Sequence, residues 1–238
     1  MPAIPRQRAR VRQAPIAAEA APTRSGSLAI DRAAPNNEQA LTYYQNRMAR
    51  LKSEEKRSAI LDAAAQAVAE RGVGAPTSLI AKLAGVAEGS IFTYFADKDL
   101  LLNELYLTAK SNLREAMVDG YPSRAPIIER FEHVWNRYLD WGMSQPALRA
   151  AMAQLMVSER ITPATRVEGE RVFGGIAGLF DDGIAAGVLR RGQPVGFMAG
   201  VIIAVAETTM QFMAKNPAEA ATYRQAGFEA IWRAIGSS

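Results

Sequence analysis

Thr77–Lys98, which reads TSLIAKLAGVAEGSIFTYFADK, contains two short helix-compatible stretches on either side of a Gly-Val pair. Gly85 predicts the end of the first stretch, because glycine adopts the positive φ that a tight interhelical turn requires. Small or apolar residues stand where the two helices have to cross closely, at Ile80, Ala81, Ala84, Val86, Ile91 and Phe95. This pattern predicts a helix-turn-helix, in which the second helix enters the major groove of DNA.

The residues around this stretch predict two flanking helices. Before it, we expect a helix from Ser53 to Arg71, with Ser53 as its N-cap and one apolar face made of Ile60, Ala64, Ala67 and Val68. The sequence from Glu38 to Lys52 is also compatible with helix and allows an extension towards the N-terminus. After the stretch, Asp97 is expected to cap a helix with a leucine-rich inner face.

The stretch and its surroundings resemble the DNA-binding domain of the TetR family of transcriptional regulators. The resemblance covers about residues 57–106 and is specific because many fixed spacings agree at once. The matching residues are Ala63-Ala64, Gly72, Thr77, Ile80-Ala81, Ala84-Gly85-Val86, Gly89, Ser90-Ile91-Phe92, Phe95, Lys98 and Leu100-Leu101. The resemblance implies an N-terminal three-helix DNA-binding domain followed by a C-terminal helical domain that binds a ligand and dimerises.

Carried over position by position, the resemblance also implies a set of DNA-contacting residues. Thr77 and Ser78 stand at a helix N-terminus, where hydroxyl and free N–H groups suit a phosphate, although a plain N-cap is an equal alternative for Thr77. Gly89 would let the recognition helix approach the bases closely. The whole set is Thr77, Ser78, Glu88, Gly89, Ser90, Phe92, Thr93, Tyr94 and Lys98.

Two positions depart from the family's usual pattern. Ala87 stands where serine or threonine usually caps the recognition helix. Alanine cannot form the side-chain cap bond, which costs about 1 kcal/mol of helix stability. Glu88 partly offsets this through the helix dipole, or it accepts a hydrogen bond from a cytosine amino group. Phe92 replaces the usual tyrosine, and the hydroxyl of Tyr94 is a candidate substitute for the lost one.

Composition argues against enzymes and metal sites. The 238 residues include no cysteine and one histidine, His133, so neither a thiolate nor a histidine-rich metal site is expected, and we expect no catalytic residue, metal or cofactor. We expect no signal sequence and no apolar run of the roughly 18–20 residues that a membrane span needs. The expected compartment is the cytoplasm, with no membrane partner.

Positive charge gathers at the N-terminus rather than in the helix-turn-helix. Residues 1–52 hold nine Lys and Arg against three Asp and Glu, whereas residues 53–103 hold five against seven. Residues 1–50 are therefore read as a basic arm, largely disordered, rich in Pro, Ala and Arg. The arm is either a solvated tail or a DNA-backbone contact through Arg6, Arg8, Arg10 and Arg12; a transit peptide fits poorly because serine is sparse.

The rest of the chain predicts helices and no strands. Helices are expected at about 125–143, 146–159, 162–187, 195–214 and 217–235, separated by Gly and Pro, which gives an all-α fold of about nine helices. We expect residues 51–103 to form the helix-turn-helix domain and residues 104–238 the ligand-binding and dimerisation domain.

Two features of the C-terminal half suggest specific roles. The helices at about 195–214 and 217–235 are expected to form a homodimer, because the first is apolar nearly all round; the alternative is that both complete the core of a monomer. An apolar ligand pocket is expected among aromatic and methionine side chains that could equally be plain core. Its candidate lining is Phe131, Trp135, Tyr138, Trp141, Met152, Met156, Phe173, Phe180, Phe197 and Met198.

Together these features predict a ligand-responsive, sequence-specific DNA-binding transcriptional regulator. A repressor released from a double-stranded DNA operator by a small apolar or amphipathic effector is the favoured form. The alternative is a non-catalytic DNA-organising protein that responds to no ligand. An enzyme on a helical scaffold is disfavoured, because the chain has one histidine, no cysteine and no carboxylate–histidine helix pairs of the kind that di-iron bundles use.

Overall fold

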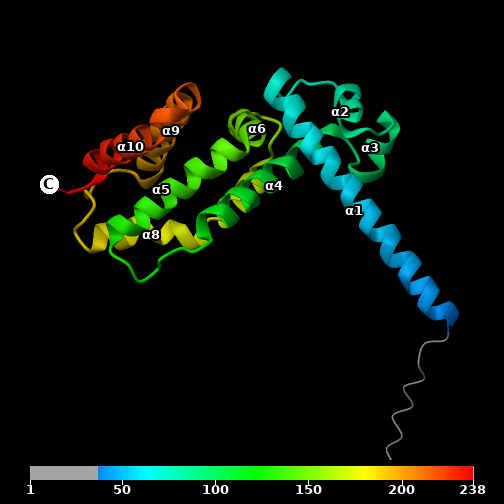
Figure 1. The fold of residues 1–238 in the computed structure, drawn as a ribbon, viewed down its shortest axis with the longest axis horizontal. Helices are drawn as coiled ribbons and strands as arrows, with labels where there is room; N and C mark the ends of the chain where they lie inside the picture. The colour runs from blue at the N-terminus through cyan, green and yellow to red at the C-terminus, as the bar shows by residue number, and fades with distance from the viewer. Residues whose placement is uncertain (1–36, 238) are drawn as a thin grey trace, which may run out of the picture. The chain divides into compact units, whose positions relative to one another are not determined.

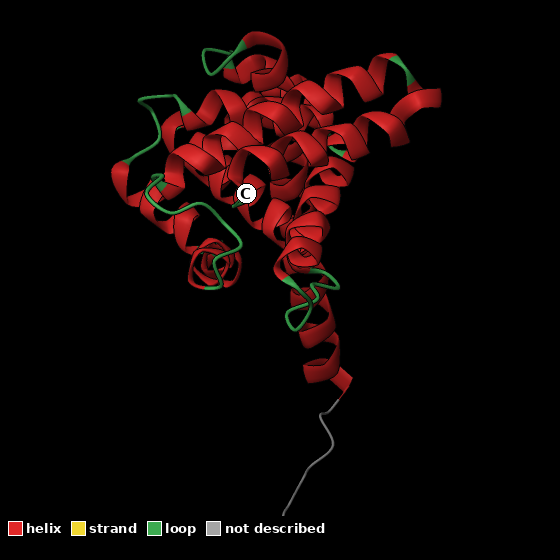
Figure 2. Cartoon of the chain, turned by 90° about the vertical axis from the view of Figure 1, so that its left-hand side faces the viewer, coloured by secondary structure: helices red, strands yellow, loops and turns green. Residues whose placement is uncertain are grey.

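The fold is built from α-helices alone. The computed structural model describes residues 37–237, which form ten α-helices and one 3-10 helix and contain no strand (Figures 1 and 2). An isolated bridge pairs Leu189 with Gly236. The expected all-α class is confirmed. Arg6, Arg8, Arg10 and Arg12 of the expected basic arm lie outside the described residues.

Helix bounds follow the Gly and Pro positions along the chain closely. They are α1 Asn37–Arg71, α2 Thr77–Ala84, α3 Glu88–Tyr94, α4 Lys98–Val118, α5 Ile127–Ser144, α6 Pro146–Met156, α7 Pro163–Arg171, α8 Gly174–Ala185, α9 Val195–Lys215, η1 Pro217–Glu219 and α10 Ala220–Ile235. The single helix expected at 162–187 is two, because Gly174 and Gly175 in succession favour a break after α7.

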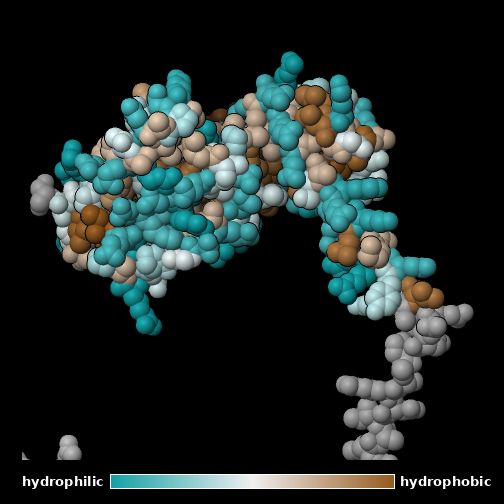
Figure 3. All heavy atoms as spheres, in the orientation of Figure 1, coloured by the Kyte–Doolittle hydropathy of each residue, from teal (hydrophilic) through white to brown (hydrophobic). Residues whose placement is uncertain are grey.

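The first helix begins earlier than Ser53. It starts at Asn37 because residues 36–52 contain neither Gly nor Pro, so Ser53 lies inside the helix and is not its N-cap. The chain divides into two units, Met1–Asn46 and Arg47–Ser238, and the contacts described below belong to the second. Apolar side chains reach the surface along the first part of α1 (Figure 3), at Leu41, Tyr43, Tyr44, Met48 and Leu51.

Two clusters of buried apolar side chains share α4. The first joins residues of α1, α2, α3 and the first half of α4, and it also takes in Ala151, Leu155 and Ile161 from α6 and the segment after it. The second joins the later part of α4, from Ala109 to Met117, to α5, α8, α9 and α10. One long helix therefore supplies side chains to both cores.

One helix in the described part of the chain, α9, is long and apolar enough to cross a membrane by length and composition. The expectation that no apolar run reaches such a length is therefore wrong by these measures. In the structure α9 packs against α10 and α5, and only 22% of its most apolar window is buried. Much of its apolar surface is thus left open.

Candidate nucleic-acid interface

The turn between α2 and α3 has the geometry that the sequence predicted. Gly85 adopts φ 65°, in the left-handed region, and the N–H of Val86 donates to the carbonyl of Ala81 at 3.0 Å. Ile80 and Ile91 are fully buried beneath the turn and hold the two helices together. The result is a helix-turn-helix with a short second helix.

Thr77 has a different role from the N-cap considered above. Pro76 occupies the N-cap position of α2 and forms no side-chain cap bond, so Thr77 is the first helical residue. Its hydroxyl donates to Oε1 of Glu88 at 2.5 Å, which ties the start of α2 to the start of α3. Ser78 is exposed beside it. Both helix N-termini therefore lie together, where free backbone N–H groups suit a phosphate.

The exposed face of α3 is made of the residues expected to read DNA. Glu88, Gly89, Phe92 and Thr93 are exposed, and Phe92 keeps 47% of its surface open. A Cβ added to Gly89 would meet no atom of the described residues within 4 Å, and the φ of Gly89 is not in the positive region. Neither packing against the described residues nor backbone conformation therefore explains glycine at this position.

The flanking residues of this face are partly buried. Ser90 is half-buried, and the ring of Tyr94 packs against the first core cluster. Ala87 is the N-cap of α3 and forms no side-chain bond, whereas Asp97, the N-cap of α4, accepts the Leu100 N–H at 2.7 Å. The structure thus confirms that α3 has no side-chain N-cap bond at Ala87.

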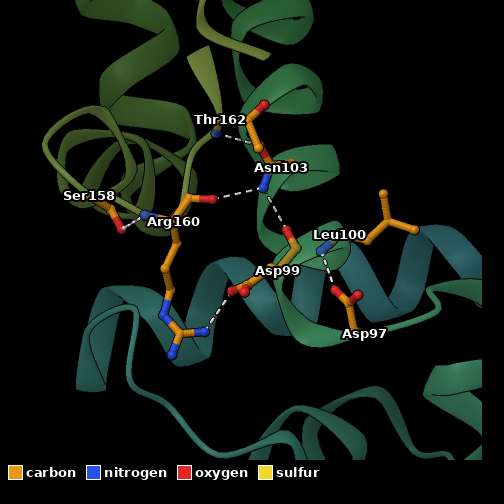
Figure 4. Close-up of polar contacts among 7 residues, drawn as sticks. All are labelled: Asp97, Asp99, Leu100, Asn103, Ser158, Arg160 and Thr162. Atoms are coloured by element: carbon orange, nitrogen blue, oxygen red, sulfur yellow. Dashed lines mark hydrogen bonds and ion pairs between the residues drawn. The ribbon is translucent and has the colours of Figure 1, made fainter. Parts of the chain in front are cut away.

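Lys98 begins α4 and is half-buried. Burial lowers the pKa of its ammonium group, and the positive charge of Arg160 lowers it further, while Asp99 acts in the opposite direction. Arg160 pairs with Asp99 at 2.6 Å (Figure 4). Sequence reasoning missed Arg160, because no local pattern connects it to a helix that begins so far upstream.

In the C-terminal half, most of the residues proposed to line a pocket pack into the second core cluster. They are Phe131, Trp135, Tyr138, Trp141, Met152, Phe173, Phe180 and Met198. Two others lie at the surface: Phe197 is 66% exposed and Met156 is 36% exposed. Two open surface grooves, one along α7 and one between α9 and α10, are lined by none of these ten residues. The pocket therefore stays a prediction.

A polar group sits inside this aromatic region. The hydroxyl of Tyr138 donates to Oε1 of Glu207 at 3.2 Å, and Nη1 of Arg149 lies 3.6 Å from Oε2 of the same carboxylate. Burial, together with the charge of Glu207, raises the pKa of Tyr138 well above its usual range. The phenol therefore stays a neutral hydrogen-bond donor. Among the described residues, no group of three His, Asp or Glu could hold a metal ion.

Comparison with known proteins gives the same picture as the geometry. A family model described as bacterial regulatory proteins, tetR family, matches residues 60–105. The fatty acid metabolism regulator protein of Bacillus subtilis is 26% identical over 161 residues, which are 66% of this chain and 82% of that protein. The family-model match begins at the buried face of α1 and includes the whole helix-turn-helix.

Solved structures extend the likeness to the C-terminal half. A tetR family transcription regulator from Shewanella sp. PV-4 is 28% identical with a TM-score of 0.68, covering 77% of this chain and 99% of that one. The transcriptional regulator FadR from Bacillus subtilis, solved in complex with stearoyl-CoA, is 22% identical with a TM-score of 0.57, covering 73% of this chain and 96% of that one. The second likeness concerns the fold alone.

Proposed function

This chain belongs to the tetR family of transcriptional regulators, and we propose that it is a sequence-specific repressor that a small apolar or amphipathic ligand releases from its operator. It is a DNA-binding regulator rather than an enzyme.

Gly89 is the observation that carries the DNA-reading role of α3. Glycine is less favourable than alanine in a helix, and Gly89 lies in the first turn of α3, where a side chain would obstruct a partner that approaches the helix. No atom of residues 37–237 occupies that space, whereas a base edge approaching α3 would. The neighbouring exposed Thr93 and half-buried Ser90 supply hydroxyl groups that can bond to base edges or phosphates.

Selection of bound sequences from a random pool of duplex DNA supplies the operator and tests the proposal. Fluorescence anisotropy then compares Gly89→Ala and Thr93→Ala with Ser123→Ala, an exposed serine between α4 and α5. We expect Gly89→Ala to weaken operator binding without lowering the free energy of unfolding. Thr93→Ala should lose about 1 kcal/mol of binding free energy, and Ser123→Ala should bind normally.

The same selection separates the repressor from its rival. A DNA-organising protein would enrich no consensus sequence, and deletion of residues 1–36 would remove most of its affinity. A repressor enriches one consensus, and the truncated protein keeps the preference even where the basic arm adds affinity. Normal operator binding by both Gly89→Ala and Thr93→Ala would contradict the assignment of α3.

We place the homodimer interface on α9 and α10. The exposed apolar residues of α9 include Phe197, Ile203 and Phe212, and an apolar groove runs between α9 and α10. A helix with so much apolar surface is stabilised by a partner, and a second copy would bring two recognition helices to half-sites about 34–36 Å apart or a multiple of that distance.

The ligand is proposed to bind within residues 104–238, and an acyl-CoA is the first class to test. The Bacillus subtilis FadR structure contains stearoyl-CoA, and that ligand is amphipathic, as the sequence analysis expected of an effector. We expect stearoyl-CoA to release labelled operator and free CoA to leave it bound. Release requires that the ligand bind the two conformations of the protein with different affinities. The proposed compartment is the cytoplasm, where the operator is.

A further inference from the structure

Arg160 connects the C-terminal half of the chain to the start of α4. It lies in residues 157–162, between α6 and α7, and its guanidinium group reaches the carboxylate of Asp99 in the first turn of α4 (Figure 4). Both side chains remain open to solvent, at 45% for Arg160 and 61% for Asp99. The ion pair therefore lies at the surface rather than in a core.

Asn103 holds the backbone around Arg160 in place. It is 7% exposed, and its amide nitrogen donates to the carbonyl of Arg160 at 2.9 Å and to that of Asp99 at 2.7 Å. Its side-chain oxygen accepts the N–H of Thr162 at 3.0 Å. Figure 4 shows Asn103 on α4, with its side chain toward Arg160 and Thr162, and the side chain of Arg160 extended toward Asp99. The hydrogen bonds of Asn103 thus fix the backbone from which the side chain of Arg160 extends.

Lys98 is the neighbouring cation and has no carboxylate of its own. Among the described residues it takes part in no ion pair, whereas Asp99 is already paired with Arg160. Burial lowers the pKa of the Lys98 ammonium group, and the positive charge of Arg160 lowers it further. Asp97, the exposed N-cap of α4, is a second carboxylate beside these two cations, and it accepts the Leu100 N–H. Lys98 is left without an ion-pair partner among the described residues, and the partner of Arg160 is open to solvent, so an external anion can reach both cations.

We propose that Arg160 binds the operator backbone together with Lys98, so that the C-terminal half of this chain contacts a DNA phosphate directly. The inference rests on the proposed DNA-reading role of α3, since Lys98 begins the helix that follows α3. A guanidinium group suits a phosphate because its N–H groups form two parallel bonds to anionic oxygens. Asp99 opposes this contact, because it competes for Arg160 and repels the phosphate.

A purely structural role for the Arg160–Asp99 pair makes the opposite prediction for one variant. An exposed ion pair contributes little to stability, and either Arg160→Gln or Asp99→Asn would remove it. If the pair only holds the segment on α4, both variants should therefore weaken DNA binding alike. If Arg160 binds phosphate, Arg160→Gln weakens binding and Asp99→Asn strengthens it.

The test measures the salt dependence of binding by the full chain, on the selected operator and on an unrelated duplex. We expect Arg160→Gln to weaken both complexes and to reduce the slope of log K against log salt by about 1 per subunit. Arg160→Lys should retain the slope, and Asp99→Asn should bind both duplexes more tightly. Arg171→Gln, which removes an exposed charge on α7, is the matched control and should bind normally. Thermal melting by circular dichroism checks that each variant is folded.

The outcomes separate this inference from the proposed function. If Lys98→Gln reduces the salt slope but Arg160→Gln leaves it unchanged, the inference is wrong and the operator-binding role stands. A common loss of affinity in Asp99→Asn and Arg160→Gln without a change of slope also overturns it. If Lys98→Gln, Gly89→Ala and Thr93→Ala all bind normally, the helix-turn-helix assignment itself fails.

Discussion

The helix-turn-helix and the C-terminal bundle of α5 to α10 are organised in different ways. In the first, a single left-handed glycine, Gly85, and two buried isoleucines determine how α2 and α3 cross. In the second, large aromatic side chains from different helices pack against one another, as Phe131 does with Phe180 at 5.2 Å and with Trp232 at 5.9 Å. The first leaves a mostly polar face open, whereas α9 in the second leaves an apolar one.

This difference explains why the sequence of the helix-turn-helix predicts a function more clearly than the sequence of the C-terminal bundle does. A turn that depends on one backbone conformation can be recognised from a few consecutive residues, because the left-handed position is usually a glycine. A site assembled from residues on distant helices leaves no such mark, because each aromatic side chain alone is indistinguishable from ordinary core. The geometry around Gly85 therefore supports DNA binding directly, whereas the bundle of α5 to α10 supports only an apolar partner of unspecified identity.

The largest expected effect comes from removing one core residue in each region. Ile91 is fully buried in the first cluster and Leu179 is 1% exposed in the second, so each truncation to alanine should cost about 2–5 kcal/mol of unfolding free energy. Native-state hydrogen exchange should then show lost protection in α2–α3 for Ile91→Ala and in α5–α10 for Leu179→Ala. Equal losses in both regions from either variant would show that the two clusters form one cooperative unit.

A smaller effect is expected from a charge on the open face of α9. Phe212 is 49% exposed at the groove between α9 and α10, and Phe212→Glu should weaken dimerisation by about 2 kcal/mol, because a buried interface excludes an unpaired charge. Sedimentation equilibrium measures the change, with Phe212→Leu as the apolar control. A wild-type chain that is monomeric at micromolar concentration would refute the proposed interface.

The smallest effect concerns the missing cap of α3. Ala87→Ser supplies a side-chain oxygen to the unbonded N–H groups at the start of α3 and should add about 1 kcal/mol of stability. A melting temperature equal to that of the wild type would show that Glu88 already compensates for the missing cap. Thr77→Val checks this reading, since it removes the hydroxyl that now bonds Glu88.

Much of the fold was predictable, because Gly and Pro residues mark the helix ends. The expected helices at about 195–214 and 217–235 correspond to α9 and to η1 with α10. The start of α1 was not predictable from Ser53, since a potential cap does not end a helix whose upstream residues also favour it. Of the site, the residues of the α3 face were expected from the resemblance to the TetR family, but the position of Arg160 depends on how residues 157–162 pack on α4.

The sharing of α4 between two cores has a consequence for protein engineering. Ala151, Leu155 and Ile161 belong to the same cluster as the buried residues of α1, α2 and α3. In a chimera that grafts only the first hundred residues onto another regulator, the grafted core would therefore pack against the other regulator's residues at these three positions, which do not match it. Exchanging operator specificity between relatives should succeed best when the graft also carries these three residues, with a junction inside α4 between Tyr106 and Ala109, where the two clusters meet.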